Sequence, residues 1–431
     1  MIKTRIKELG SYIGQEVSLS GWVYNLRSSG SIIFLQFRDG YGFIQAIAAK
    51  NSVDEEIWEN AKKITIESSV VLTGKVTEHP KQKGVYELQV NNIELINIAE
   101  EYPIGKKDHG PEFLLDNRHL WLRSPKQWAI QRIRYTIIRE TYDYFSQEGF
   151  IKIDAPILTP TACEGTTTLF EINYFDKDKA YLTQSGQLYI EAAIMSHNRV
   201  FDFGPVFRAE KSKTRRHLTE FWMMDAEMSF VDHRDNMTIQ ENLITSIVKR
   251  VLKDNQEELK ILERDIKLLE KIATPFDKIT YTEAVDILQK QGSEMKWGDD
   301  FGADDEAIIS RQHEKPVFVE KYPAIIKPFY MKRDPLNDKV AMNNDLLAPE
   351  GYGEIIGGSQ REDDYEILIK RFKEYNVPIE PYEWYLDLRR YGSVPHAGFG
   401  YGLERLTAWI CGIHHIRETI PFPRLMNRLT P

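Results

Sequence analysis

The segment 201–230 constrains the fold more than any other stretch, because two apolar-rich runs flank a basic loop there. The runs at 199–208 and 221–230 have the composition of β-strands. The loop between them carries Lys211, Lys213, Arg215, Arg216 and His217. We therefore predict a β-hairpin with a positively charged loop.

Charged residues also occur within the predicted strands, beside apolar neighbours. Arg208 and Glu210 belong to the first strand and its end, and Asp225 and Glu227 to the second. Charges in such surroundings usually need partners. Because guanidinium groups bind phosphate well, we interpret the hairpin as a phosphate-handling site. The alternative is an exposed basic turn.

The composition indicates a globular protein of two or three domains. The chain has 431 residues, of which 42% are hydrophobic and 28% charged. The net charge of −9 means that only local basic patches could bind a polyanion. Cys163 and Cys411 lack the spacing of a zinc cluster or a disulfide framework. Without a signal-like or membrane-spanning apolar run, we expect a cytoplasmic protein with no membrane partner.

Apolar and polar residues alternate through residues 16–99 in five short runs, with one helical stretch at 54–64. This order is typical of an OB-type β-barrel, whose second and third strands commonly bind oligonucleotides. The corresponding face would present Arg27, Phe34, Gln36 and Gln45. Aromatic rings stack on bases and amides read base edges, although Phe34 could instead belong to the barrel core.

We expect three regions along the chain: the barrel at 1–100, a linker at 101–128, and a larger domain at 129–431. The larger domain includes a helical insertion around 250–315. An amphipathic helix at 126–149 precedes a strand interrupted by Pro156. This helix and strand could form plain core or a dimer interface.

Two carboxylates are predicted on neighbouring strands of the larger domain, Asp345 and Glu354. Such a pair suits Mg²⁺ that bridges phosphates, and the alternative is a pair of surface acids. Arg361 follows shortly after. Arg405 stands near the start of a helix, where a guanidinium and the helix N-terminus together favour an anion.

Dinucleotide-binding and P-loop folds are excluded, because no GxGxxG follows a βαβ pattern and no GxxxxGK[ST] occurs. The arginines, the carboxylate pair and the cationic loop together predict a nucleoside-triphosphate site on a mostly antiparallel sheet. The expected fold class is α+β.

Three motifs carry a resemblance to a known family: the helix and strand that end at Pro156, FRAE with RRHLTEF, and GYGLER. In this order they resemble the class II aminoacyl-tRNA synthetases, in the aspartyl, asparaginyl and lysyl subgroup. The resemblance covers nearly the whole chain. It implies an anticodon-binding OB-fold barrel, a class II catalytic domain with an antiparallel sheet flanked by helices, and a homodimer with Pro156 at the interface.

The resemblance also implies roles for individual residues. Arg208 would hold the α-phosphate of ATP and Phe221 would stack on adenine, near Glu210. His217 and Arg405 would meet the γ-phosphate. The expected ligands of Mg²⁺ are Asp345 and Glu354. The residues expected around the α-amino group of the bound amino acid are Glu164, Ser185 and Gln187. Phe34 and Gln45, with Arg27 nearby, would read the central anticodon base.

The stretch QSGQLYIEA bears on the choice of amino acid. Aspartate enzymes usually have QSPQLYKQ here, and the lysine balances the carboxylate of the substrate. This chain has Ile190 at that position, so a neutral amide is favoured. Arg361 would donate to the amide oxygen, and Asp225 or Glu227 would accept from its NH₂. Asparaginyl enzymes commonly have glutamate where this chain has Asp225.

We therefore expect ATP-dependent attachment of asparagine to tRNA(Asn) through an asparaginyl-adenylate, with release of AMP and pyrophosphate. A nondiscriminating aspartate–tRNA ligase is the main alternative. An asparagine synthetase-like paralogue and a non-catalytic RNA-binding module are others. A lysine enzyme would need acidic residues at the side-chain end of the pocket.

Overall fold

The computed structural model describes residues 2–105, 107–163, 169–175, 179–212 and 214–431. The chain divides into two compact units, Met1–Gly110 and Pro111–Pro431. Residues 111–121, which the sequence placed in a linker, form the short helices α2 (Pro111–Asp116) and α3 (Arg118–Trp121) of the second unit.

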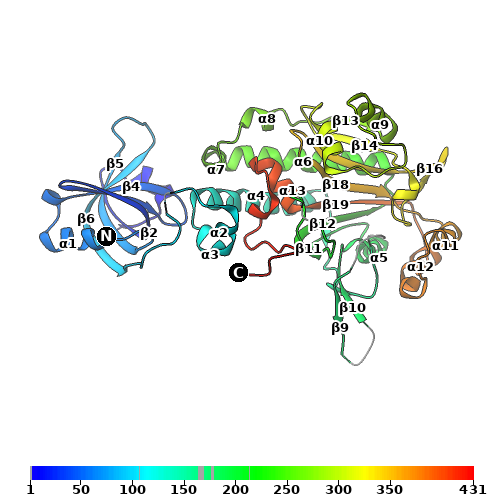
Figure 1. Ribbon diagram of the computed structural model, residues 1–431, viewed down its shortest axis with the longest axis horizontal. Helices are drawn as coiled ribbons and strands as arrows, with labels where there is room; N and C mark the ends of the chain where they lie inside the picture. Colours follow the sequence, from blue (N-terminus) through cyan, green and yellow to red (C-terminus); the bar gives the residue numbers. More distant parts are fainter. Residues whose placement is uncertain (1, 106, 164–168, 176–178, 213) are drawn as a thin grey trace. The chain divides into compact units, whose positions relative to one another are not determined.

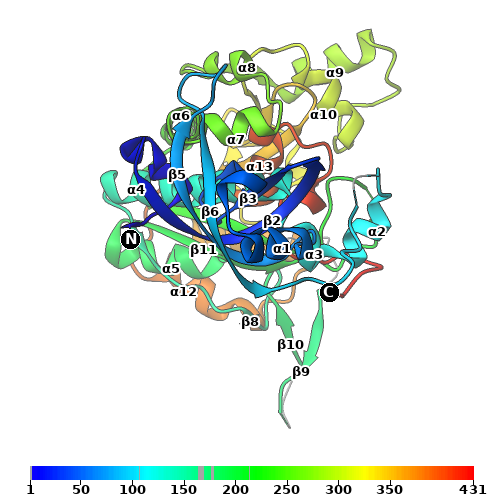
Figure 2. The same cartoon turned by 90° about the vertical axis from the view of Figure 1, so that its left-hand side faces the viewer.

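The first unit is a β-barrel with one α-helix (Figures 1 and 2). Its strands are β1 (Ile2–Lys3), β2 (Glu16–Ser29), β3 (Ile32–Arg38), β4 (Phe43–Ala49), β5 (Ser69–Glu78) and β6 (Tyr86–Asn97). Its helices are η1 (Ile6–Tyr12), η2 (Lys50–Ser52) and α1 (Glu55–Lys63). The sheet order is β1-β2-β3-β4-β6-β5, and pairing of β2 with β5 closes it. This confirms the OB-fold barrel.

Alternation along the barrel strands separates a core from a polar face. Ile33, Leu35 and Phe37 of β3 are buried in the apolar core of this unit. The side chains between them, including Phe34 and Gln36, are only half-buried. Because successive side chains of a strand point to opposite sides, the half-buried set shares the outer face.

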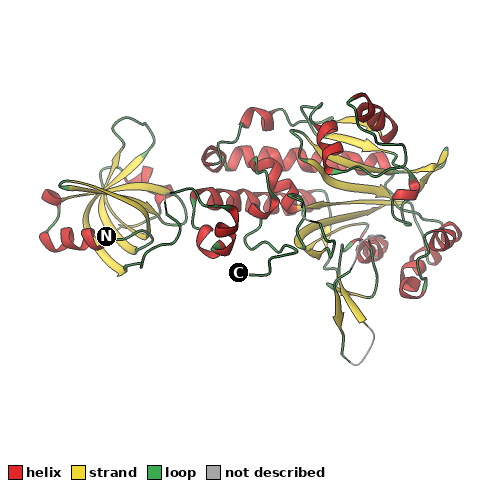
Figure 3. Cartoon of the chain, in the orientation of Figure 1, coloured by secondary structure: helices red, strands yellow, loops and turns green. Residues whose placement is uncertain are grey.

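The second unit is built on one large mixed sheet (Figure 3). Among the described residues its order is β13-β14-β17-β18-β19-β12-β11-β7, and the neighbours are antiparallel except β13–β14 and β11–β7. The strands are β7 (Ile151–Lys152), β11 (Arg199–Phe207), β12 (Glu220–Ser229), β13 (Asp277–Thr280), β14 (Val317–Glu320), β17 (Asn343–Ala348), β18 (Gly353–Gln360) and β19 (His396–Gly402). This antiparallel centre with flanking helices confirms the expected α+β class.

Short strands and helices complete this unit. The strands outside the main sheet are β8 (Leu158–Thr159), β9 (Glu171–Asn173), β10 (Lys179–Leu182), β15 (Arg333–Asp334) and β16 (Asn337–Ala341). The longer helices are α4 (Pro125–Gln147), α5 (Gln187–His197), α6 (His233–Asp254), α9 (Tyr281–Lys290), α11 (Tyr365–Glu374) and α13 (Leu403–Cys411). The shorter ones are α7 (Gln256–Ile261), α8 (Ile266–Glu270), α10 (Ala303–Ser310), α12 (Glu383–Arg390), η3 (Ala324–Ile326), η4 (Glu380–Tyr382) and η5 (Ile416–Glu418). No helix in the described part of the chain has the length and apolar character needed to cross a membrane.

The hairpin expected at 201–230 is present as β11 and β12, which pair antiparallel over their whole lengths. Met224, Ala226 and Met228 of β12 point into the core that α4, α6 and α13 share with the sheet. The side chains between them, Asp225 and Glu227 included, therefore lie on the opposite face, where α5 packs. The hairpin thus directs its charged residues away from the helical layer of α4 and α6.

The strand expected after the first long helix is divided in two. β7 is the last strand of the main sheet and pairs with β11, whereas β8 pairs with β10 in a small separate sheet. Pro156 lies between them, and its missing N–H cannot continue a ladder. The backbone instead bonds to one sheet through Ile153 N and Phe201 O, at 2.9 Å, and to the other through Thr183 N and Ile157 O, at 2.8 Å.

Candidate active site

A cavity of about 590 Å³ opens on the sheet face that α5 covers. Its wall contains residues from β12 and from the segment that joins β11 to β12, from β17, β18 and β19, and from the start of α5 and α13. Among the residues proposed from the sequence, the cavity is lined by Ser185, Gln187, Arg208, Glu210, His217, Phe221, Asp225, Asp345, Glu354, Arg361 and Arg405. Segments from distant parts of the chain thus meet at one site.

The hairpin supplies a cation and an aromatic ring side by side. The Arg208 guanidinium lies 5.9 Å from the centre of the Phe221 ring, and its Nη2 donates to Gln184 O at 3.0 Å. The backbone N of Arg208 also bonds to Thr219 O at 3.0 Å, which extends the pairing of the hairpin. The arrangement can hold a flat heterocycle beside an anionic group.

Cations gather at the loop end of the cavity. Arg216 Nη2 donates to Glu306 Oε2 at 2.6 Å, and the same oxygen accepts from Glu354 N at 2.9 Å. Burial lowers the pKa of His217, and the neighbouring Arg405 lowers it further. The cavity wall at this end therefore contains three positively charged or polar donors, Arg216, His217 and Arg405. Such a set suits an extended polyanion.

Asp345 and Glu354 come from neighbouring strands, and each is paired with a cation. Lys327 Nζ donates to Asp345 Oδ2 at 3.0 Å, and Arg405 Nη1 donates to Glu354 Oε2 at 2.7 Å. Burial raises the pKa of Asp345 to about 6, with Lys327 acting against it and Glu354 adding to it. Burial would also raise the pKa of Glu354, but Arg405 and Lys327 outweigh it and hold that pKa below its usual value.

The geometry of these two carboxylates fits Mg²⁺. A Cβ atom added to Gly357 would lie 3.3 Å from Glu354 Oε1 and 3.8 Å from Asp345 Oδ1, so both oxygens face the same space. Mg²⁺ is commonly bound by one or two carboxylates together with substrate phosphates.

The opposite end of the cavity is more enclosed and contains a buried carboxylate. Asp225 Oδ2 accepts from Ser185 Oγ and from Gly186 N, each at 2.9 Å. Burial raises the pKa of Asp225 to about 6, although these two hydrogen bonds oppose the rise. Its other oxygen, Oδ1, faces Gly400, where a Cβ would approach within 2.5 Å. Glycine at this position leaves room for the carboxylate at the cavity wall.

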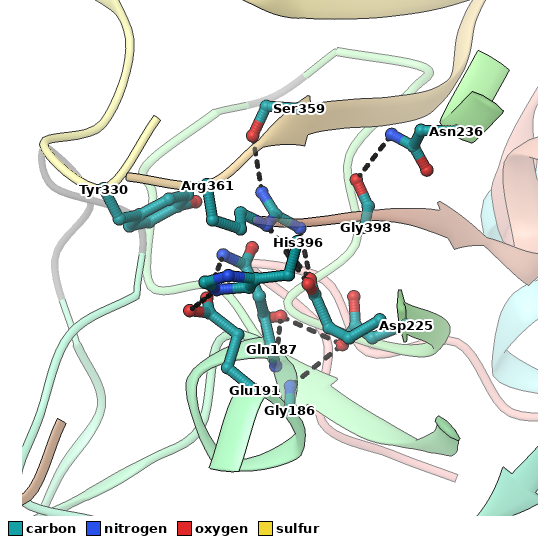
Figure 4. A network of polar contacts seen from close by, with 12 residues as sticks. Gly186, Gln187, Glu191, Asp225, Asn236, Tyr330, Ser359, Arg361, His396 and Gly398 are labelled. Atoms are coloured by element: carbon teal, nitrogen blue, oxygen red, sulfur yellow. Dashed lines mark hydrogen bonds and ion pairs between the residues drawn. The ribbon is translucent and has the colours of Figure 1, made fainter. Parts of the chain in front are cut away.

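Arg361 supplies the cation at this end (Figure 4). Its Nη1 donates to Ser359 Oγ at 2.6 Å, and its Nε lies 3.1 Å from Glu227 Oε1. The Tyr330 ring lies 5.5 Å from the guanidinium. Glu227 is fully buried beneath Arg361 and is not part of the cavity wall. It therefore acts on the cavity through Arg361.

The barrel carries its own set of expected residues on one face. The Arg27 guanidinium lies 4.4 Å from the centre of the Phe34 ring, and the two residues pair across β2 and β3. Gln36 and Gln45 pair across β3 and β4. Asn25 Nδ2 donates to Gln36 Oε1 at 2.7 Å, and Gln45 Nε2 donates to Glu87 Oε1 at 2.8 Å. A half-buried aromatic ring beside oriented amides suits a single-stranded nucleic acid.

Two protein-family models match the two parts of the chain. The model of the class II tRNA synthetases (D, K and N) matches residues 110–426, and the OB-fold nucleic acid binding domain matches residues 17–96. The chain belongs to the class II tRNA synthetases of the D, K and N group.

Solved structures of this family are similar over the full chain. One is asparaginyl-tRNA synthetase from Pyrococcus horikoshii complexed with asparaginyl-adenylate, at 46% identity and a TM-score of 0.96, with 100% of both chains covered. Entamoeba histolytica asparaginyl-tRNA synthetase in complex with asparaginyl-adenylate has 30% identity and a TM-score of 0.89, covering 100% of this chain and 99% of the other. The aspartyl tRNA synthetase from Entamoeba histolytica has 30% identity and a TM-score of 0.84, with 100% and 93% covered.

Among the described residues proposed for the amino-acid site of this class II synthetase, two do not line its cavity, Ile190 and Glu227. Ile190 is fully buried and packs with Ile194 and Val200 in an apolar cluster. Gln187, three residues earlier on α5, does line the cavity. Glu164 lies outside the described residues.

Several residues of the synthetase site were not expected from the sequence. Lys327 lines the cavity and follows the 3₁₀ helix η3. Glu191 is fully buried on α5. In both cases one charge stands within an apolar run, IIKPFYM or QLYIEAAIM, and a charge in such a run needs a partner. That signal could have identified both residues.

Proposed function

We propose that this chain attaches asparagine to tRNA(Asn) in two steps, using ATP. The carboxylate of asparagine attacks the α-phosphorus of ATP, so that asparaginyl-adenylate forms and pyrophosphate leaves. A hydroxyl of the terminal ribose of tRNA then attacks the carbonyl carbon of the adenylate, and AMP leaves. The family and the similarity to asparaginyl-adenylate-bound relatives support this reaction.

The choice of asparagine is carried by one observation, the balanced charge at the enclosed end of the cavity. The Arg361 guanidinium is already paired with the buried Glu227 carboxylate. Arg361 can still donate to a carboxamide oxygen, and Asp225 can accept from the NH₂ group. A substrate carboxylate would instead face the ionised Asp225 as a like charge.

The remaining cavity residues orient and stabilise the reacting groups. Phe221 would stack on adenine, while Arg208 beside it would offset charge on the α-phosphate as the new bond forms. His217 and Arg405 would bind the outer phosphates, near Glu210. Positioning and electrostatics account for most of the catalysis in reactions of this kind.

Asp345 and Glu354 would hold Mg²⁺. When bound there, Mg²⁺ would supply positive charge to the phosphate oxygens. Arg405 already contacts Glu354, so the same carboxylate would link the metal and the guanidinium.

The barrel would bind the anticodon through Arg27, Phe34, Gln36 and Gln45. Phe34 would stack on the central anticodon base, and Gln45, held by Glu87, would read its edge. Basic residues close to the nucleic acid make this binding sensitive to salt in spite of the negative net charge.

A homodimer formed through α4 and the chain around Pro156 is also part of this proposal. Exposed apolar side chains in this region include Tyr135 at 60%, Ile151 at 46% and Ile157 at 42%. Light scattering at several protein concentrations would test the assembly. The cytoplasmic location stays a prediction, which cell fractionation would test.

ATP–pyrophosphate exchange with each amino acid tests the proposed function. We expect exchange with asparagine to exceed exchange with aspartate at equal concentrations. Faster exchange with aspartate would identify an aspartate–tRNA ligase instead. Loss of all exchange with tRNA binding retained would indicate a non-catalytic RNA-binding protein.

A further inference from the structure

A buried polar cluster lies behind the amino-acid end of the cavity, centred on Glu191 of α5 (Figure 4). Gln187, one helical turn earlier, lines the cavity, and its Nε2 donates to Glu191 Oε1 at 3.1 Å. A carboxylate can only accept hydrogen bonds. The Gln187 amide must therefore turn its NH₂ to Glu191, which leaves its oxygen for the other side.

The second oxygen of Glu191 has three donors. Oε2 accepts from Tyr385 Oη at 2.7 Å and from Arg389 Nη2 at 2.9 Å, and His396 Nε2 lies 3.1 Å away. Neither the Glu191 nor the Arg389 side chain is exposed. Burial alone would raise the pKa of Glu191, but Arg389 and His396 outweigh it and hold the pKa well below its usual range. Glu191 is thus a fixed negative charge.

The cluster also reaches Arg361. The backbone N of Arg361 donates to the backbone O of His396 at 2.9 Å, so the two arginines of this region are joined through one residue. Glu227 pairs with Arg361, and Glu191 pairs with Arg389 and lies beside His396. Removing one member of such a set leaves an uncompensated charge in a low-dielectric region.

We propose that Glu191 is a positioning residue that makes the site select a neutral amide side chain over a carboxylate. It fixes the Gln187 amide with its oxygen away from Glu191, and it cancels the charge of Arg389 behind the site. The contribution of α5 to the choice of amino acid then comes from Glu191 and not from Ile190, whose side chain packs in an apolar cluster. This inference rests on the proposed function.

Glu191→Gln tests the proposal through a ratio, kcat/KM for asparagine divided by kcat/KM for aspartate in pyrophosphate exchange. The substitution keeps the size of the side chain and leaves Arg389 uncompensated, so we expect the ratio to fall by roughly ten-fold or more. The KM for ATP should not change. Because both constants come from one preparation, the ratio does not depend on the fraction of folded enzyme.

Arg389→Gln supplies the opposite test. It leaves Glu191 without its main cation, so we expect aspartate to be rejected more strongly and the ratio to rise. The double variant, Glu191→Gln with Arg389→Gln, removes both charges, and its ratio should return to within about three-fold of the native value. If Glu191→Gln does not fold, Arg389→Gln and the double variant still give this contrast.

Glu258→Gln is the matched control, because Glu258 is a buried partner of Arg132 between α4 and α7 and does not line the cavity. In Glu258→Gln the ratio of kcat/KM for asparagine to kcat/KM for aspartate should equal that of the native enzyme. Equal losses for both amino acids in Glu191→Gln and Arg389→Gln, with ratios within about two-fold of native, would indicate a purely structural role and overturn the proposal. A native enzyme that prefers aspartate would instead overturn the proposed function, whatever the variants do.

Discussion

Arg361 and Glu227 form an ion pair beneath the cavity in which neither side chain is more than 3% exposed. Arg361 Nε lies 3.1 Å from Glu227 Oε1, and Ser359 occupies a further nitrogen of the guanidinium. Neither charge can be left alone at this depth without a large desolvation cost. Each partner therefore contributes to stability in the presence of the other, and the pair also bears on substrate choice.

Glu227→Gln should reveal that contribution. Breaking a buried pair by removing one partner leaves an uncompensated charge, so we expect the free energy of unfolding to fall by about 3–5 kcal/mol. Urea denaturation followed by tryptophan fluorescence and circular dichroism measures it. Glu314→Gln breaks the exposed pair with Lys271 and should change the free energy by less than about 1 kcal/mol. Equal effects of the two substitutions would contradict this account.

Asp225 predicts a pH dependence. Its pKa is raised to about 6, so below that pH it is protonated and no longer a full acceptor for the carboxamide NH₂. We expect kcat/KM for asparagine to fall about ten-fold per pH unit below pH 6. Since the folded pKa exceeds the ordinary value of 3.8, ionising Asp225 also costs stability as pH rises from 3.8 to about 6.

Asp225→Asn separates this effect from the titration of Asp345, whose pKa is also raised to about 6. The variant should lose the acid limb in kcat/KM for asparagine, while the pH profile of KM for ATP remains. If the limb persists in Asp225→Asn, another group controls asparagine binding.

Asp345→Asn should increase the Mg²⁺ requirement. With one carboxylate of the pair neutral, we expect the Mg²⁺ concentration for half-maximal exchange to rise roughly ten-fold or more. Exchange measured across a Mg²⁺ series, with EDTA as the zero point, gives the value. Asp300→Asn is the control, because Asp300 lines the same cavity and is not an expected ligand. A native requirement in Asp345→Asn would remove Asp345 from the metal site.

Phe34→Ala should separate the two reactions. Base stacking on an aromatic ring contributes about 1–3 kcal/mol, so we expect tRNA charging to weaken by roughly ten-fold with exchange unchanged. Ile96→Ala removes a different apolar side chain of the barrel, which is 61% exposed, and should leave charging native. Parallel losses of charging and exchange in Phe34→Ala would contradict an anticodon role.

The sequence predicted the hairpin and barrel well because their signals are local. Alternation along β3 separates Leu35 from Phe34, and the basic loop marks the turn between β11 and β12. Charged residues on the cavity face of the hairpin were identified because they break apolar runs. Their convergence with Asp345, Glu354 and Arg405 was expected because these groups together suit a nucleoside triphosphate, and the family resemblance then assigned a role to each.

Other features depend on contacts that no local pattern reveals. The run IIKPFYM has strand composition, yet Pro323 and Pro328 bracket η3 and leave Lys327 beside Asp345. Ile190 was chosen by its position in a motif, but its side chain packs in an apolar cluster, whereas the neighbouring Glu191 contacts Gln187. The partners of Glu191 follow it by about 200 residues along the chain, so sequence alone could not join them.

The glycines of β19 define a limit for redesign of the substrate range. A Cβ on Gly398 would overlap the Glu227 carboxylate, and one on Gly400 would approach Asp225 Oδ1 to 2.5 Å. β12 and β18 hold this strand on both sides, so it cannot retreat to admit a bulkier residue. Substitution of the charged groups can therefore change which small substrate side chain is accepted. The absence of side chains at Gly398 and Gly400 limits how large the group at position 225 or 227 can be.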